Sequence, residues 1–226
     1  PIQTLSAPET LVVPLLQHVG VEAQPVVAKG DEVLKGQLLA DAGSAISAPV
    51  HSPVSGKVLA IEPRAHQSGH SITAIVIEND GNDTWVEKSG HPDPVQLDAK
   101  TIIERIREAG IVGMGGAGFP TALKLVPPPG ITPDYLIING CECEPYFTAD
   151  DRLMVEYPED IILGAQLMAK ASGARKIVIA IEDNKPEAYA ALKAKAGAIE
   201  IVLVPTRYPA GGEKQLIQFI TRREVP

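Results

Sequence analysis

The chain has 226 residues, a formal net charge of −8 at pH 7 and an aromatic content of 4%. This length accommodates one large or two modest domains, and the negative charge argues against a nucleic-acid-binding surface, which needs a basic face. Two cysteines cannot build a disulfide framework, so we expect reduced thiols. The apolar runs are too short to span a bilayer, so any membrane association should be peripheral.

Residues 1–96 alternate short β-rich runs with turn residues. Gly, Pro and Asp separate the apolar runs, and the longest expected strand covers residues 72–78. Short strands punctuated in this way predict a small all-β sandwich or barrel.

Two segments of this region, 30–39 and 48–58, resemble lipoyl- and biotinyl-carrier domains. Those domains attach their cofactor to a lysine at the tip of the hairpin between the two segments. Here the intervening stretch 41–47 contains no lysine. We therefore expect a barrel-sandwich hybrid (lipoyl-like) module over residues 1–96 that serves packing or docking rather than a swinging arm.

From residue 97 onward, helices and strands are expected to alternate. Asp98 can cap a helix whose apolar residues share one face and which stops at Gly110. The other expected elements are strands at 135–138, 177–181 and 199–204 and helices at 159–171, 186–192 and 213–220. This βαβ spacing predicts a Rossmann-like α/β domain over residues 97–226 with a mainly parallel sheet.

A glycine-rich loop at residues 113–118 precedes a short helical stretch that ends at Lys124. Its backbone can approach a ligand closely, and its N–H groups together with the lysine suit a phosphate-bearing cofactor. The spacing also matches the G-x-G-x-x-G fingerprint, but a helix rather than a strand precedes it and the expected acidic residue is absent. A tight turn that only lets a helix pack on the sheet is the alternative.

Two further loops are unusual in composition. Gly211 and Gly212 follow the last strand and open a helix, which suits either a ligand site or a turn capped by Glu213. Cys141 and Cys143 supply only two metal ligands, and the five histidines are interpreted as surface loop residues, so we predict no metal site. The two thiols could instead shape a cofactor loop. Residues 150–152 are expected to cap the following helix.

With these loops considered together, the α/β half closely resembles the C subunit of the Rnf electron-transport complex, and more distantly the flavin-binding subunit of respiratory complex I. The matching segments are 113–124, 139–145 with 148–154, and 208–217. The lipoyl-like region ahead of them is itself the arrangement of the Rnf subunit. The resemblance therefore covers essentially the whole chain.

The resemblance implies an FMN site, with NADH as the substrate. It implies that Gly113, Gly115 and Gly116 line the flavin and that Lys124 reaches its polar edge or phosphate. It also implies hydrogen bonds to the flavin from Asn139, Glu142, Gly212 and Glu213. Phe119 would stack on the nicotinamide nucleotide, and Glu144 would hydrogen-bond to the ribose of that nucleotide. No catalytic side chain is expected, because the flavin carries the hydride and single-electron chemistry. The three loops should then fold into one cradle.

The sequence also departs from the pattern of these relatives. Met114 stands where the complex I subunit has an arginine, Cys141 replaces an aspartate, and Lys214 replaces an acidic residue. Beyond the position of Pro226 the family continues with further flavin contacts, a β-grasp-like domain and a cysteine-rich region for two 4Fe-4S clusters. We interpret the chain as a C-terminally truncated part of the subunit that holds most of the flavin pocket and neither cluster.

The predicted function is that of an FMN-binding, NADH-oxidising peripheral subunit of a membrane-bound, ion-translocating complex of the ferredoxin:NAD oxidoreductase type. Partner subunits would hold it at the cytoplasmic face of the inner membrane. One alternative is the diaphorase subunit of complex I or of a hydrogenase. Another is a non-enzymatic scaffold or quinone-binding relative that has lost the flavin.

Overall fold

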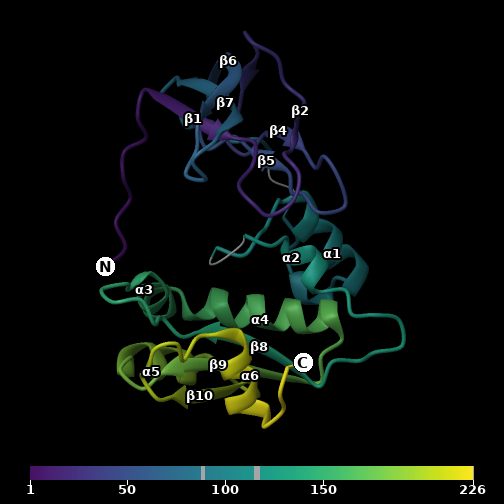
Figure 1. The fold of residues 1–226 in the computed structure, drawn as a ribbon, viewed down its shortest axis with the longest axis vertical. Helices are drawn as coiled ribbons and strands as arrows, with labels where there is room; N and C mark the ends of the chain where they lie inside the picture. The colour runs from purple at the N-terminus through teal and green to yellow at the C-terminus, as the bar shows by residue number, and fades with distance from the viewer. Residues whose placement is uncertain (88–89, 115–117, 226) are drawn as a thin grey trace. The chain divides into compact units, whose positions relative to one another are not determined.

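A computed structural model describes residues 1–87, 90–114 and 118–225, which form two compact units (Figure 1). The barrel unit comprises Leu5–Asp93 and Lys100–Val126, and the sheet unit comprises Pro1–Thr4, Pro94–Ala99 and Pro127–Pro226. Residues 100–126 thus group with the barrel unit. The predicted domain boundary between residues 96 and 97 stays a prediction.

The barrel unit contains two antiparallel sheets around one apolar core. The first has the order β1-β7-β6-β3 and the second the order β2-β4-β5. Their strands are β1 (Thr10–Pro14), β2 (Gln24–Pro25), β3 (Glu32–Val33), β4 (Leu38–Asp41), β5 (Val50–His51), β6 (Gly56–Ala65) and β7 (Ser71–Asn79). The all-β module predicted from the sequence is confirmed.

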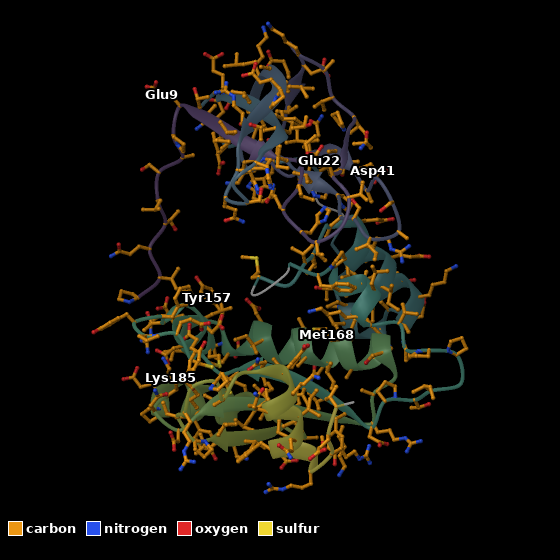
Figure 2. All side chains as sticks on the ribbon, in the orientation of Figure 1. Glu9, Glu22, Asp41, Tyr157, Met168 and Lys185 are labelled. Carbon is orange, nitrogen blue, oxygen red and sulfur yellow. The ribbon has the colours of Figure 1, made fainter. Side chains whose placement is uncertain are left out.

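The core of this unit is filled by inward-facing apolar residues from both sheets, among them Leu15, Leu39, Val58, Ile75 and Ile77. Such burial is the main stabilising contribution to a small β module. The side chain of Glu22, labelled in Figure 2, joins two segments of this unit, since its carboxylate accepts the Thr73 N–H (3.3 Å).

Two helices complete the barrel unit: α1 (Ala99–Glu108), whose first residue belongs to the sheet unit, and α2 (Thr121–Lys124). Gly110 follows α1 with a φ of 66° and lies so close to Pro49 that a Cβ would collide with the Pro49 carbonyl. Glycine is therefore required there both for the left-handed conformation and for the close approach. The predicted helix stop at Gly110 is confirmed.

The sheet unit is a parallel sheet of order β10-β9-β8. Its strands are β8 (Tyr135–Gly140), β9 (Lys176–Glu182) and β10 (Glu200–Val204). Its helices are η1 (Pro94–Gln96), α3 (Ala149–Glu156), α4 (Pro158–Ser172), α5 (Pro186–Lys195) and α6 (Glu213–Thr221). The predicted α/β fold with crossover helices is confirmed, since helices connect each pair of parallel strands.

Helices cover both faces of this sheet. Ile179 and Ile181 pack with residues of α4 and α5, whereas Ala180 and Val204 pack with Leu216 of α6. This is the alternation that a strand imposes on successive side chains. Because all three strands run in the same direction, the loops that follow β8, β9 and β10 begin at one edge of the sheet.

One expectation about the helices is wrong. Residues 150–152 do not cap a following helix but lie inside α3, where Asp150 and Asp151 form part of the first turn. No strong amphipathic period marks this segment. The partner of the first N–H groups of α3 is instead Glu142, which lies several residues earlier in the chain.

Candidate functional site

The glycine-rich loop of the barrel unit is closed at its base by main-chain contacts. The Gly113 N–H donates to the Phe119 carbonyl (2.9 Å), and Val112 and Pro120 form an antiparallel bridge. The chain therefore leaves and returns at one place before entering α2, the predicted short helix ending at Lys124. Two of the predicted flavin-lining residues, Gly115 and Gly116, fall outside the described residues.

Lys124 lies directly beside this closed loop. Its Nζ is 6.0 Å from the centroid of the Phe119 ring, and a Cβ added to Gly113 would come within 3.4 Å of the same nitrogen. Within the described part of its own unit, no carboxylate forms an ion pair with this exposed lysine. The structure thus brings three predicted site residues together and leaves a cation there for an anionic ligand.

A cleft of about 620 Å³ adjoins the same loop within the barrel unit. Its walls come from Pro49 and His51, from the residues that follow α1, and from Gly113, Met114 and Gly118. Burial lowers the pKa of the His51 imidazole, because desolvation disfavours the charged ring. The cleft thus places His51, whose charged form is disfavoured, near residues of the glycine-rich loop.

In the sheet unit, the middle and last predicted loops are joined at the carboxyl ends of the strands. The Asn139 side-chain amide donates to the Gly211 carbonyl (2.9 Å), and the Gly211 N–H donates to Cys143 Sγ (3.0 Å). A Cβ at Gly211 would lie 2.9 Å from that sulfur and 3.0 Å from the Cys141 carbonyl. Glycine is needed for this close approach, and the thiol of Cys143 helps to shape the junction.

The last loop leads directly into α6. Gly212 is the N-cap residue of that helix and Glu213 is its first residue. The first N–H groups of a helix, here preceded by two glycines, are suited to bind an anion. The side chain of Asn139 therefore meets Gly211, next to the N-cap residue Gly212, at the edge of the sheet.

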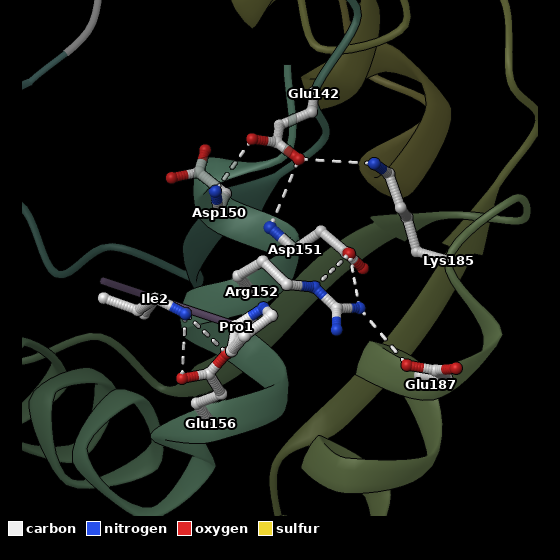
Figure 3. A network of polar contacts seen from close by, with 9 residues as sticks. All are labelled: Pro1, Ile2, Glu142, Asp150, Asp151, Arg152, Glu156, Lys185 and Glu187. Carbon is white, nitrogen blue, oxygen red and sulfur yellow. Dashed lines mark hydrogen bonds and ion pairs between the residues drawn. The ribbon is translucent and has the colours of Figure 1, made fainter. Parts of the chain in front are cut away.

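Glu142 is buried, and its carboxylate has three donors within the sheet unit (Figure 3). Its oxygens accept the N–H of Asp150 (2.7 Å), the N–H of Asp151 (3.2 Å) and the ammonium of Lys185 (3.3 Å). A carboxylate is favourable at a helix N-terminus, where N–H groups lack partners within the helix. The structure thus uses Glu142 to fasten the loop after β8 to α3 and to the start of α5.

A second contact links the same two helices. The Arg152 guanidinium donates to Asp151 (2.7 Å) and to Glu187 of α5 (3.2 Å), as Figure 3 shows. Glu144 lies further along the loop, and its side chain is exposed. Burial, followed by the negative charges of Glu142 and Glu144, raises the pKa of Asp150. The loop after β8 is therefore acidic, with Lys185 as its nearby cation.

The run 182–185 was missed by the sequence reasoning. Glu182 ends β9 with its carboxyl group buried, Asp183 accepts the N–H of Thr206 (3.0 Å), and Lys185 pairs with Glu142. The sequence contains a pattern that could have revealed this run. Four polar residues directly follow the expected apolar strand 177–181, and ligands of parallel sheets bind at the carboxyl ends of the strands.

Metal ligation finds no support in the described ranges 1–87, 90–114 and 118–225, where no group of three or more His, Cys, Asp or Glu side chains could hold a metal ion. Both cysteines are free. Two histidines differ from expectation. His51 lies in β5 and is half-buried. His18 is buried rather than on a surface loop, and its Nε2 accepts the Ala48 N–H (3.1 Å) while its Nδ1 contacts the Val19 carbonyl (3.0 Å).

Two family models match the chain. The model described as the RnfC barrel sandwich hybrid domain matches residues 1–82, and the model of the Nuo51 FMN-binding domain matches residues 106–226. The second match covers more than half of the sequence. The chain belongs to the Nuo51 FMN-binding domain family. Its first unit carries the RnfC-type module that the sequence predicted.

Proteins similar to this chain along its whole length are the C subunits of ion-translocating oxidoreductase complexes, which confirms the predicted resemblance. The one from Vibrio cholerae is 49% identical over 100% of this chain and 30% of that protein. The C subunit of the proton-translocating ferredoxin:NAD(+) oxidoreductase complex of Clostridium ljungdahlii is 46% identical over 100% of this chain and 50% of that protein. The chain thus spans 30% to 50% of the length of these relatives.

A solved structure with a similar fold is that of an NAD⁺-reducing [NiFe]-hydrogenase. It is 33% identical with a TM-score of 0.50, over 57% of this chain and 24% of that chain. None of the helices in the described ranges combines the length and the apolar character that crossing a bilayer requires.

The described residues around Lys124 fit a flavin phosphate. Lys124 is an exposed cation beside Gly113, an arrangement that suits a ligand that carries negative charge. At Gly211 any larger side chain would collide with Cys143, so the missing Cβ there is explained by packing within the protein. The meeting of all three loops in one cradle stays a prediction, since the first loop and the other two lie in different units.

Proposed function

We propose that this chain is the flavin- and NADH-binding part of a peripheral subunit in a membrane-bound, ion-translocating complex of the ferredoxin:NAD oxidoreductase type. The observation that carries the proposal is the hydrogen-bonded junction of Asn139, Cys143 and Gly211 at the carboxyl edge of a parallel sheet. It occurs in a chain that belongs to an FMN-binding family. In open α/β sheets, ligands bind at this edge.

The residues would act by holding and orienting rather than by reacting. The main chain at Gly113, Gly115 and Gly116 would line the flavin, Lys124 would neutralise its phosphate, and Asn139, Gly212 and Glu213 would fix its polar edge. Glu142 would act mainly by holding the loop after β8 in place, because its oxygens already accept three hydrogen bonds. Phe119 would stack on the nicotinamide nucleotide, and Glu144 would accept a ribose hydroxyl.

Bound FMN would supply hydride acceptance from NADH and single-electron transfer to two 4Fe-4S clusters, which would lie outside these 226 residues. Partner subunits of the complex would hold the protein at the cytoplasmic face of the inner membrane. The RnfC-type module at residues 1–82 would serve docking, since it has no lysine between positions 41 and 47.

A second candidate is the diaphorase subunit of a hydrogenase. It is favoured by the 33% identity to the NAD⁺-reducing hydrogenase over 57% of the chain. The identities of 46–49% to Rnf-type subunits over the whole chain favour the first proposal.

FMN titration of the purified protein, followed by quenching of flavin fluorescence, tests the proposal. Lys124→Met should weaken binding roughly tenfold or more, because a hydrogen bond to a charged group contributes about 1.5–3 kcal/mol. Lys100→Met is the matched control, since Lys100 is an exposed lysine of α1 that pairs with Glu104. Addition of NADH should then bleach the bound flavin.

Two results would contradict the proposal. Equal FMN affinity of Lys124→Met and Lys100→Met would remove the assigned phosphate contact. A protein that continues past residue 226 and still binds no FMN would be a non-enzymatic scaffold or a quinone-binding relative.

A further inference from the structure

The end of the glycine-rich loop rests on the barrel. Gly118 has a φ of 61°, and a Cβ added there would lie 3.2 Å from both the Gln17 carbonyl oxygen and the His18 Cα. Glycine suits this position for two reasons, the left-handed conformation and the close approach of another main chain. The barrel segment 17–18 therefore supports the loop where it returns toward α2.

The chain just before the loop rests on a second barrel segment. Gly110 lies against Pro49, and a Cβ at Gly110 would collide with the Pro49 carbonyl. Every residue of these two contacts also lines the cleft of about 620 Å³ beside the loop. The barrel thus holds both flanks of the glycine-rich loop, and the same contacts shape the cleft.

His18 joins the two supporting segments of the barrel. The residue is 8% exposed, its Nε2 lies 3.1 Å from the Ala48 nitrogen, and its Nδ1 lies 3.0 Å from the Val19 carbonyl oxygen. Because a carbonyl only accepts, Nδ1 carries the ring proton, and Nε2 is left to accept the Ala48 N–H. Ala48 directly precedes Pro49. One buried ring therefore ties the segment that supports the end of the loop to the segment that supports its start.

Main-chain hydrogen bonds carry this arrangement to Lys124. The Gly113 N–H donates to the Phe119 carbonyl (2.9 Å), and the Thr121 N–H donates to the Ile111 carbonyl (3.0 Å). These bonds join the two sides of the base of the loop, immediately before Lys124 at the end of α2. A change in the spacing of the two flanks would therefore disturb the base of the loop and the place of this lysine.

We propose that His18 is a positioning residue for ligand binding: by tying the two barrel segments together, it holds the glycine-rich loop in the shape that binds the flavin phosphate beside Lys124. This inference rests on the proposed function. Main-chain groups occupy both ring nitrogens of His18, so the residue acts through the loop and not as a ligand contact. The RnfC-type module takes part in ligand binding in this way, in addition to docking.

The first experiment uses the protein without FMN and measures the hydrogen exchange of single main-chain amides by NMR. In His18→Ala, the N–H groups of Gly113 and Thr121 should exchange roughly tenfold faster, because loss of the tie lets the base of the loop open more often. His18→Gln can still accept the Ala48 N–H through its amide oxygen. Its exchange rates should lie between those of wild type and His18→Ala.

Val58→Ala is the control that separates positioning from stability. Val58 is a core residue of β6 with 1% exposure and belongs to neither supporting segment, so its truncation destabilises the barrel without changing the tie. Well below the unfolding temperature, its Gly113 N–H should exchange as in wild type. Unchanged exchange at Gly113 in His18→Ala, or an equal rise in Val58→Ala, would overturn the inference.

Gly118→Ala changes the same contact from the side of the loop, and it serves even where His18→Ala fails to fold. Gly81→Ala is its matched control, since Gly81 also has a left-handed φ (74°) but no atom within 4 Å of an added Cβ. Both changes introduce backbone strain, whereas only Gly118→Ala also presses on the Gln17 carbonyl. The Gly113 N–H should exchange faster in Gly118→Ala than in Gly81→Ala, and equal rates would contradict support of the loop by the barrel.

The second experiment measures FMN affinity by quenching of flavin fluorescence. His18→Ala and Gly118→Ala should each weaken binding by roughly threefold to tenfold, whereas Val58→Ala and Gly81→Ala should bind as wild type does. The double variant of His18→Ala with Gly118→Ala should lose less than the product of the two single factors, because both changes act on one contact. Factors that simply multiply would show that His18 does not act through the end of the loop.

The two experiments separate the possible failures. Faster exchange at Gly113 together with unchanged FMN affinity would overturn the link between His18 and the ligand. If no protein in the set binds FMN, the proposed function and this link both fail, while the exchange rates still decide whether His18 holds the loop.

Discussion

Removing one partner of the ion pair between Glu142 and Lys185 should cost several kcal/mol of folding free energy. Their side chains are 3% and 13% exposed, and the Oε2 and Nζ atoms are 3.3 Å apart. At an effective dielectric constant of about 20, charges at this distance attract by about 5 kcal/mol, and desolvation offsets part of that. Removing one partner of a buried pair costs about 3–5 kcal/mol, because the other charge is left buried and unpaired.

Lys185→Met is the perturbation that tests this reasoning. Two backbone N–H groups of α3 would remain on the Glu142 carboxylate, so we expect the lower end of the range, about 3 kcal/mol. The double variant Glu142→Gln with Lys185→Met should lose less than the sum of the two single changes, with a coupling of about 0.5–3 kcal/mol.

Urea unfolding followed by far-UV circular dichroism measures the loss. The single tryptophan, Trp85, lies in the barrel unit, so its fluorescence reports on the unit that the substitution does not touch. Lys195→Met, which breaks the exposed pair with Glu159, is the control and should change little. If Lys185→Met costs no more than this control, or if the single losses simply add, the pair does not fasten the loop as described.

Two further predictions concern the loops of the sheet unit. Gly211→Ala should destabilise the protein by about 1–3 kcal/mol, because the added methyl group overpacks against Cys143. Gly164→Ala is the control: Gly164 lies in the middle of α4 with open space around it, so this change should stabilise the protein by up to about 1 kcal/mol. Equal effects of the two changes in urea unfolding would contradict the close approach at Gly211. Because partial burial raises the pKa of the Cys141 thiol to about 12, its alkylation by iodoacetamide at pH 8 should be slow and should accelerate steadily with pH, as followed by peptide mass spectrometry. Fast labelling of Cys141 in the folded protein at pH 8 would refute its neutral, half-buried state.

Local sequence patterns were sufficient for most of the sheet unit. The apolar runs at 135–138, 177–181 and 199–204 predicted β8, β9 and β10, and Gly173 ends α4 in the left-handed conformation expected of a helix stop. These features depend on neighbours within a few residues. For the same reason, the closed loop between Gly113 and Phe119 and the helix ending at Lys124 could be anticipated.

The roles that were missed depend on residues far apart in the chain. Glu142 pairs with Lys185, which lies 43 residues further along the chain, and no sequence pattern near either residue predicts this contact. Helix α3 was missed because its first N–H groups are capped by that same carboxylate rather than by a residue next to the helix. His18 was assigned to the surface, but it is buried, and the N–H of Ala48, 30 residues away, supplies the hydrogen bond that its ring nitrogen needs there.

The close approach of Gly110 to Pro49 has a practical consequence for anyone dividing this protein for expression. A cut between residues 96 and 97 would leave the barrel strands in one piece and α1, α2 and the glycine-rich loop in the other, although both belong to one compact unit. Each product would carry a newly uncovered surface, and that of the second piece would include the walls of the cleft beside Gly113. Shortened versions are better designed to keep residues 5–126 together.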